Sequence, residues 1–233
     1  MTSPIQLINV EKHSQVKIKS TTNYIHAKEQ QVVPLIVHEF AMASAAMPVV
    51  FVKNSVNGEF QAVALLGLKP AENVFYSEDK WLGAYLPALI THHPFALVPS
   101  QNDENQLQVA LKEDSYLVSH EEGEAIFDDK GNETDYMTKR KNALGQYFEN
   151  TRVTDAFIKY LVEKNLLSQQ QLSLKINNEN MTIDGIYLVD EKALNELSND
   201  DFLVLRQRGY LAPIYNHMNS LHQLRTIAQL KTQ

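Results

Sequence analysis

Residues 48–68, PVVFVKNSVNGEFQAVALLGL, constrain the fold more than any other stretch of the chain. Two apolar, β-prone runs flank the dipeptide Asn57-Gly58, a pair that readily adopts the positive φ angles of a tight turn. The pattern therefore predicts a β-hairpin, and with it an antiparallel sheet in this part of the chain.

The segments on either side of the hairpin extend the pattern. Before it, Ile36, Phe40, Ala43 and Met47 recur at helical spacing, and Pro48 is expected to end that helix. After it, short β-prone runs alternate with turn-rich stretches, as is typical of an antiparallel meander. These runs are FALVPS, QLQVAL, SYLVS and EAIFD, followed by the predicted turn DDKGNET.

Helical spacing dominates from about residue 135 onward, with two helices expected over residues 135–150 and 152–168. Two strands are predicted around residues 177–180, and Ser198 and Gly209 mark the start and end of a later helix. We therefore predict an α+β fold, with a largely antiparallel sheet region in the N-terminal two-thirds and a helix-richer C-terminal part packed against it. We expect a single domain over residues 1–233, with any subdomain boundary near residues 130–150.

Composition excludes several classes of function. The chain of 233 residues has a formal net charge of -7, which weighs against a nucleic-acid-binding protein, since such proteins normally carry a basic patch. It contains no cysteine, so disulfides, thiolate metal sites and thiol nucleophiles are excluded. We find no secretory signal and no apolar run of membrane-spanning length, and these observations predict a cytoplasmic protein without a membrane span.

The histidines offer two candidate sites, and neither forms a complete motif. His38-Glu39 begins like a zinc-protease helix, but that motif needs a second histidine where Met42 stands. His92 and His93 precede Pro94, which favours extended geometry, so their side chains are expected to point to opposite faces and not to share a metal. We predict no metal ligands and no catalytic residue, and the sequence does not identify a cofactor.

An aromatic group is the strongest candidate for binding. Aromatic rings interleaved with prolines and polar side chains are typical of binding pockets and interfaces, although an ordinary core uses the same residues. If this region binds a ligand, we expect His92 and His93 to line the edge of the pocket. The predicted binding residues are Trp81, Tyr85, Phe75, His92, His93, Phe95, His38 and Glu39.

Several blocks of the sequence resemble the bacterial SapC family, in order and over residues 25–230. They include VPLIVHEFAMASAAMPVVFVK, VALLGLKPAENVFYSEDKWLGAYLPALITHHPFAL, GEAIFDDKGNET and IDGIYLVDEKALNELSNDDFLVLRQRGYLAPIYNHMNSLHQL. The family's name implies a surface-layer association. Its members often lie near genes for flavin-dependent tryptophan-halogenase-like proteins, cupin-type proteins and TonB-dependent outer-membrane receptors. The resemblance implies no catalytic residues.

Two functions follow as expectations. The first is an accessory or binding protein that acts with a flavin-dependent halogenase-like enzyme or an outer-membrane uptake system; this rests on the resemblance and on the lack of a catalytic motif. The alternative is an enzyme of unrecognised type, acting on a peptide or small aromatic substrate between the aromatic group and the His38-Glu39 helix. Whether the protein is an enzyme, and its oligomeric state, are left open by the sequence.

Overall fold

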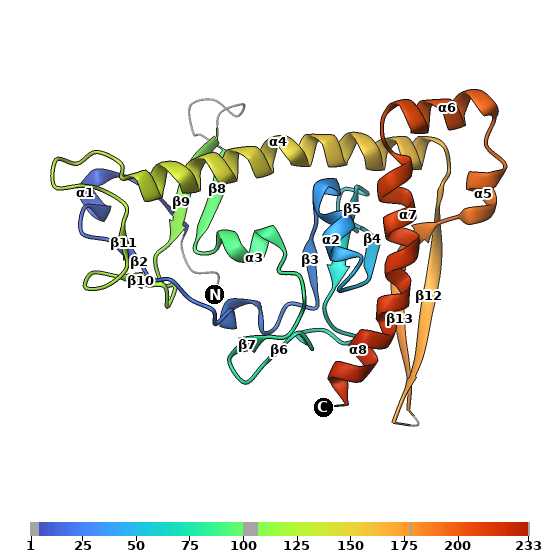
Figure 1. Cartoon of the computed structure of the whole chain (residues 1–233), viewed down its shortest axis with the longest axis horizontal. Helices are drawn as coiled ribbons and strands as arrows, with labels where there is room; N and C mark the ends of the chain where they lie inside the picture. Colours follow the sequence, from blue (N-terminus) through green and yellow to red (C-terminus); the bar gives the residue numbers. More distant parts are fainter. Residues whose placement is uncertain (1–4, 100–106, 178, 233) are drawn as a thin grey trace. The chain divides into compact units, whose positions relative to one another are not determined.

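The computed structural model describes residues 5–99, 107–177 and 179–232, and the chain divides into two compact units (Figure 1). Unit 1 comprises Met1–Thr22 and Thr91–Glu149, and unit 2 comprises Asn23–Ile90 and Asn150–Gln233. Each unit therefore combines two separate stretches of sequence. Helix α4 (Asp135–Glu163) contributes its first part to unit 1 and its second part to unit 2. The expected single domain stays a prediction.

Unit 1 contains two small antiparallel sheets, with strand orders β1-β9-β8 and β10-β2-β11. Its buried side chains include Phe95, Leu111, Ile126 and Met137, which pack into one apolar cluster. The elements of unit 1 are β1 (Ile5–Leu7), α1 (Val10–His13), β2 (Lys17–Ile18), β8 (Phe95–Pro99), β9 (Leu107–Lys112), β10 (Val118–Ser119), β11 (Glu124–Ala125) and the first part of α4.

Unit 2 is organised around a five-stranded antiparallel sheet of order β12-β13-β4-β5-β3. Its strands are β3 (Val32–Pro34), β4 (Val49–Lys53), β5 (Phe60–Leu65), β12 (Leu167–Ile176) and β13 (Glu179–Val189), and a separate hairpin pairs β6 (Tyr76–Ser77) with β7 (Lys80–Trp81). Val49, Val50 and Phe51 are consecutive and fully buried, so the middle of the sheet is covered on both faces.

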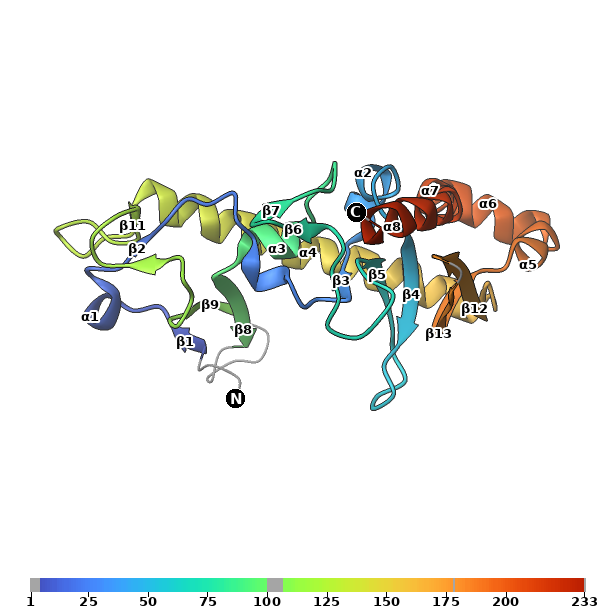
Figure 2. The same cartoon turned by 90° about the horizontal axis from the view of Figure 1, so that it is seen from below.

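The helices of unit 2 cover this sheet. Figure 2 shows α2, α7 and α8 on the same side of it, and α7 packs against α2, β4 and β13. Phe157 of α4 makes ring contacts with Phe40, Phe51 and Tyr210 in the core. The helices that lie wholly in unit 2 are η1 (Ile25–Ala27), η2 (Val37–Glu39), α2 (Phe40–Ala43), α5 (Glu191–Asn195), α6 (Asn199–Gln207), α7 (Leu211–Ser220), η3 (Leu221–Gln223) and α8 (Leu224–Lys231), whereas α3 (Ala88–His92) begins in unit 2 and ends in unit 1.

The α+β class and the antiparallel sheets are confirmed, as is the helix-rich C-terminal part. The predicted hairpin is formed by β4 and β5, but its connection spans residues 54–59, and only Gly58 of the central pair has a positive φ angle, at 75°. Ser198 does cap α6, because its side chain accepts a hydrogen bond from the backbone N–H of Asp201 at 3.1 Å.

One helix stands where two were expected. α4 runs without a break to Glu163, and it ends where Asn165 adopts a left-handed conformation with φ 54°. The backbone N–H of Leu166 then bonds to the carbonyl of Leu161 at 2.8 Å, which closes the helix end. Within the described part of the chain, no helix combines the length and the apolar character needed to cross a membrane.

Candidate functional site

The aromatic segment, residues 75–89, is held in unit 2 by contacts between its own side chains. The buried ring of Phe75 stacks on Trp81, with 5.9 Å between ring centres and 22° between planes. The indole N–H of Trp81 donates a hydrogen bond to the carbonyl of Tyr85 at 2.8 Å. Gly83 permits this arrangement, because a Cβ atom there would lie 2.8 Å from Nε1 of Trp81.

A buried carboxylate at the end of η2 holds the aromatic segment. Glu39, only 6% exposed, accepts hydrogen bonds at Oε1 from the Tyr85 hydroxyl at 2.6 Å and from the Ala88 backbone N–H at 2.8 Å. Its Oε2 accepts from the backbone N–H of Ile36 at 3.1 Å. These donors compensate for burying a carboxyl group, so Glu39 acts as a connecting point between η2 and the aromatic segment.

The other end of the segment has its own anchor. The Asn73 side chain is buried, donates to the carbonyl of Ala27 at 2.8 Å and accepts from the backbone N–H of Phe75 at 2.9 Å. Within the segment, Trp81 and Tyr85 are half-buried, while Leu82 and Leu89 are 42% and 40% exposed. The segment therefore exposes apolar side chains, while hydrogen bonds of Asn73 and Glu39 hold its backbone near both ends.

The predicted binding residues divide between the two units. Phe75, Trp81, Tyr85 and Glu39 come together in unit 2, as described above. His38 also belongs to unit 2, but its side chain is exposed and makes no hydrogen bond to the rest of the group within the described residues. His92, His93 and Phe95 belong to unit 1 and have contacts of their own.

His92 and His93 contact different aromatic rings of unit 1. The prediction of extended geometry was wrong for His92, which is the last residue of α3, since the helix continues to two residues before Pro94. Its ring meets Tyr147 edge-on at 5.3 Å, whereas His93 stacks near Tyr116 at 6.2 Å and lies 2.8 Å from the Ser115 hydroxyl. Pro94, joined by a cis peptide bond, leads directly into β8, as expected.

His92 is unusual among these residues because it is buried without a full set of partners. Its side chain is 7% exposed, and Nδ1 has no hydrogen-bond partner in the described part of the chain. Burial, and then the positive charge of Arg140, lower the pKa of the His92 ring. The third residue of this group, Phe95, is a core residue, 6.4 Å from the ring of Tyr136.

No metal site arises from these side chains. Among residues 5–99, 107–177 and 179–232, the structure places no group of three or more histidine, aspartate or glutamate side chains where they could hold a metal ion.

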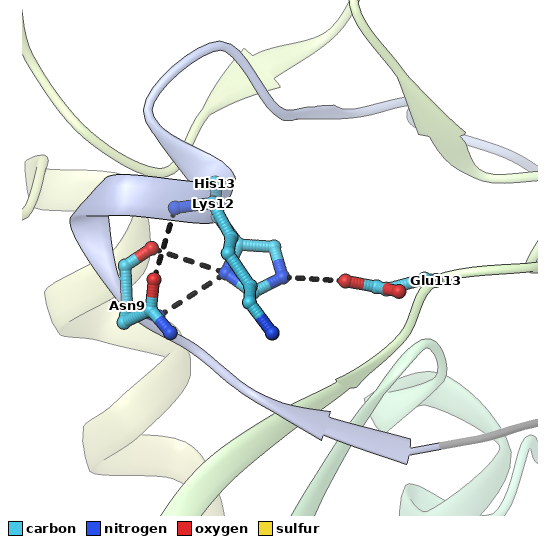
Figure 3. A network of polar contacts seen from close by, with 4 residues as sticks. All are labelled: Asn9, Lys12, His13 and Glu113. Carbon is cyan, nitrogen blue, oxygen red and sulfur yellow. Dashed lines mark hydrogen bonds and ion pairs between the residues drawn. The ribbon is translucent and has the colours of Figure 1, made fainter.

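Sequence reasoning missed a histidine–carboxylate pair in unit 1. Figure 3 shows His13 on α1 between Asn9 and Glu113: its Nε2 lies 3.0 Å from Oε1 of Glu113, and its Nδ1 lies 3.1 Å from both the backbone nitrogen and the carbonyl oxygen of Asn9. The Asn9 side chain also caps α1 by accepting from the backbone N–H of Lys12 at 2.9 Å. The two members of the pair are 100 residues apart, so no local spacing could have indicated it.

A third buried histidine joins α7 to the sheet of unit 2. His217 of α7 is fully buried; its Nδ1–H donates to the carbonyl of Val49 on β4 at 2.7 Å, and its Nε2 accepts from the backbone N–H of Val189 on β13 at 3.0 Å. Burial lowers the pKa of His217 from 6.5 to about 4, so the ring is neutral in the fold. The residue therefore connects α7 to both β4 and β13 within unit 2.

One of three comparisons with known proteins found a match. The model of the family described as SapC matches residues 8–227, nearly the whole chain. No curated protein and no solved structure matches it.

Proposed function

The chain belongs to the SapC family, and we propose that it is an accessory binding protein whose aromatic segment contacts a flavin-dependent halogenase-like enzyme. The observation that carries the proposal is the carboxylate of Glu39, which holds the segment through Tyr85 and Ala88. A surface that is ordered before binding loses less conformational entropy when a partner docks, and this favours affinity.

The composition of the segment supports the same role. Tryptophan and tyrosine are over-represented among the residues that dominate binding energy, and both are half-buried here beside exposed leucines in the sequence. The choice of a flavoprotein as the partner comes from the genes that accompany members of the family, so it rests on association. An outer-membrane uptake system is the second partner that this association suggests.

We expect a charge in the middle of the segment to prevent docking. Leu82→Asp is predicted to weaken binding to the purified halogenase-like flavoprotein by about thirtyfold, because a carboxylate would be buried without a partner. A loss of affinity of this size is typical when a residue at the centre of an interface is replaced. Surface-plasmon resonance with the full chain measures this. Leu203→Asp on α6 is the matched control, since Leu203 is equally exposed and lies in the same unit.

Equal weakening by the two substitutions would contradict the proposal, as would unchanged binding by Leu82→Asp.

The alternative function is an enzyme that acts on a peptide or small aromatic substrate between the aromatic group and the His38-Glu39 helix. The buried carboxylate at that position is Glu39. The three hydrogen bonds to that carboxylate favour a positioning role over proton transfer, because each would have to be given up or shared during a reaction.

A further inference from the structure

Unit 2 contains a groove that is separate from the aromatic segment. It lies between the end of the β4–β5 hairpin and the last turns of α4, and its volume is about 630 Å³, within the range of small-molecule sites. The hairpin contributes Lys53, Gly58, Glu59 and Phe60, and α4 contributes Asp155, Ile158, Lys159, Val162 and Glu163.

Three of the side chains that line the groove are apolar: Phe60, Ile158 and Val162. The five α4 residues of the groove are three or four positions apart and therefore share one face of the helix. On this face the aliphatic side chains of Ile158 and Val162 lie between charged ones. The Phe60 ring, on the hairpin side of the groove, makes an edge-on contact with Tyr187, with ring centres 4.8 Å apart. The apolar part of a ligand could pack against these three side chains.

The two lysines of the groove already interact with neighbouring side chains. The Lys159 ammonium lies 3.9 Å from a carboxylate oxygen of Glu163, and the Lys53 ammonium lies 5.3 Å from the centre of the Phe60 ring. These contacts leave Glu59 and Asp155 as the carboxylates that no lysine of the groove neutralises.

Glu59 and Asp155 come from opposite walls of the groove. Glu59 accepts a hydrogen bond from the uncharged side chain of Asn57 at 2.6 Å, and the side chain of Asp155 has no hydrogen bond or ion pair with any residue that the structure describes. Both residues are exposed, but partial desolvation raises the pKa of the Asp155 carboxyl, and the negative charge of Glu59 raises it further. A cation between the two walls would relieve this repulsion.

We propose that the groove binds an organic cation, with an ammonium or guanidinium group between Glu59 and Asp155 and an apolar body on Phe60, Ile158 and Val162. A positive group gains charge-assisted hydrogen bonds from both carboxylates, whereas an anionic ligand would meet two like charges. The inference does not depend on the proposed function, because it uses a different part of unit 2.

Isothermal titration calorimetry on the full chain tests the charge of the ligand. The probes are phenethylamine, hydrocinnamate, which carries a carboxylate on a similar body, and acetylated phenylalanyl-lysine amide. We expect at least one of the two cationic probes to bind and hydrocinnamate not to bind; the tighter cationic probe tells whether a free amine or a basic peptide side chain is preferred. Equal binding of hydrocinnamate, or no binding of either cationic probe at millimolar concentrations, overturns the proposal.

Substitutions test the location of the site with the same titration. Asp155→Asn and Glu59→Gln are each expected to weaken binding of the tighter cationic probe by at least about fivefold, as for loss of one partner of a charged hydrogen bond. Asp200→Asn removes the same charge from an exposed position on α6 and is expected to leave binding unchanged. Binding that survives both groove substitutions, or that Asp200→Asn weakens equally, overturns the assignment to this groove.

Discussion

Replacing Glu39 by alanine is expected to lower the free energy of unfolding by about 3 to 5 kcal/mol. The substitution leaves the Ile36 and Ala88 backbone N–H groups and the Tyr85 hydroxyl without their acceptor, and it removes most of a buried side chain. Urea denaturation measures the loss. The emission of Trp81, the sole tryptophan, should also shift to the red as the segment loosens.

Two further variants show whether the lost hydrogen bonds cause the effect. Glu39→Gln keeps the shape but replaces one accepting oxygen by an amide NH₂ group, so an intermediate loss is expected. Glu29→Ala removes an exposed carboxylate from the same unit and should change the unfolding free energy by less than about 0.5 kcal/mol. If Glu39→Ala were as mild as Glu29→Ala, the carboxylate could not be what fixes the segment.

Replacing His217 by phenylalanine is expected to lower the free energy of unfolding by about 2 to 4 kcal/mol at neutral pH. Phenylalanine preserves the ring contact with Phe51, 5.0 Å between ring centres, but leaves the Val189 N–H without an acceptor and removes a donor from the Val49 carbonyl. His92→Phe is the matched control, because Nδ1 of that buried histidine has no hydrogen bond to lose within the described residues. It should stay within about 1 kcal/mol of the unmodified protein.

The effect of His217 should also depend on pH. The pKa of the ring is about 4 in the fold and 6.5 when exposed, so below pH 6.5 the unfolded chain takes up a proton that the folded chain does not. The stability that His217 contributes is therefore complete above pH 6.5 and is lost as the pH falls toward 4, by roughly 3 kcal/mol in all. The stability gap between His217→Phe and the unmodified protein should narrow over this range; a constant gap would show that the ring is not held neutral.

The features that the sequence could predict are those encoded by neighbouring residues. The β4–β5 hairpin, the cap at Ser198 and the turn at residues 128–134 each depend on a few consecutive side chains, and all are present. α4 shows the limit of the same reasoning. A boundary was expected near residue 151, but the sequence there contains neither proline nor a left-handed residue, and the helix ends only at Asn165.

The candidate site could be predicted only in part, because its contacts join distant parts of the chain. Phe75, Trp81 and Tyr85 are close in sequence, so their grouping was visible as a pattern. The bonds from Glu39 to Tyr85 and Ala88 span 46 and 49 residues, and the His13–Glu113 contact spans 100. The groove likewise joins a hairpin to a helix about a hundred residues later. Hydrophobic periodicity reports which face of an element is buried, but not which partner covers it.

The most direct test of the proposed function uses the single tryptophan as a reporter. The full chain is labelled with fluorotryptophan, which gives one fluorine resonance, from position 81, because the sequence has no other tryptophan. Titration with the unlabelled halogenase-like flavoprotein should shift or broaden this resonance, and the Leu82→Asp variant should show no change. A complex that forms while the resonance stays unchanged, or no complex at all, would contradict a binding surface at the aromatic segment.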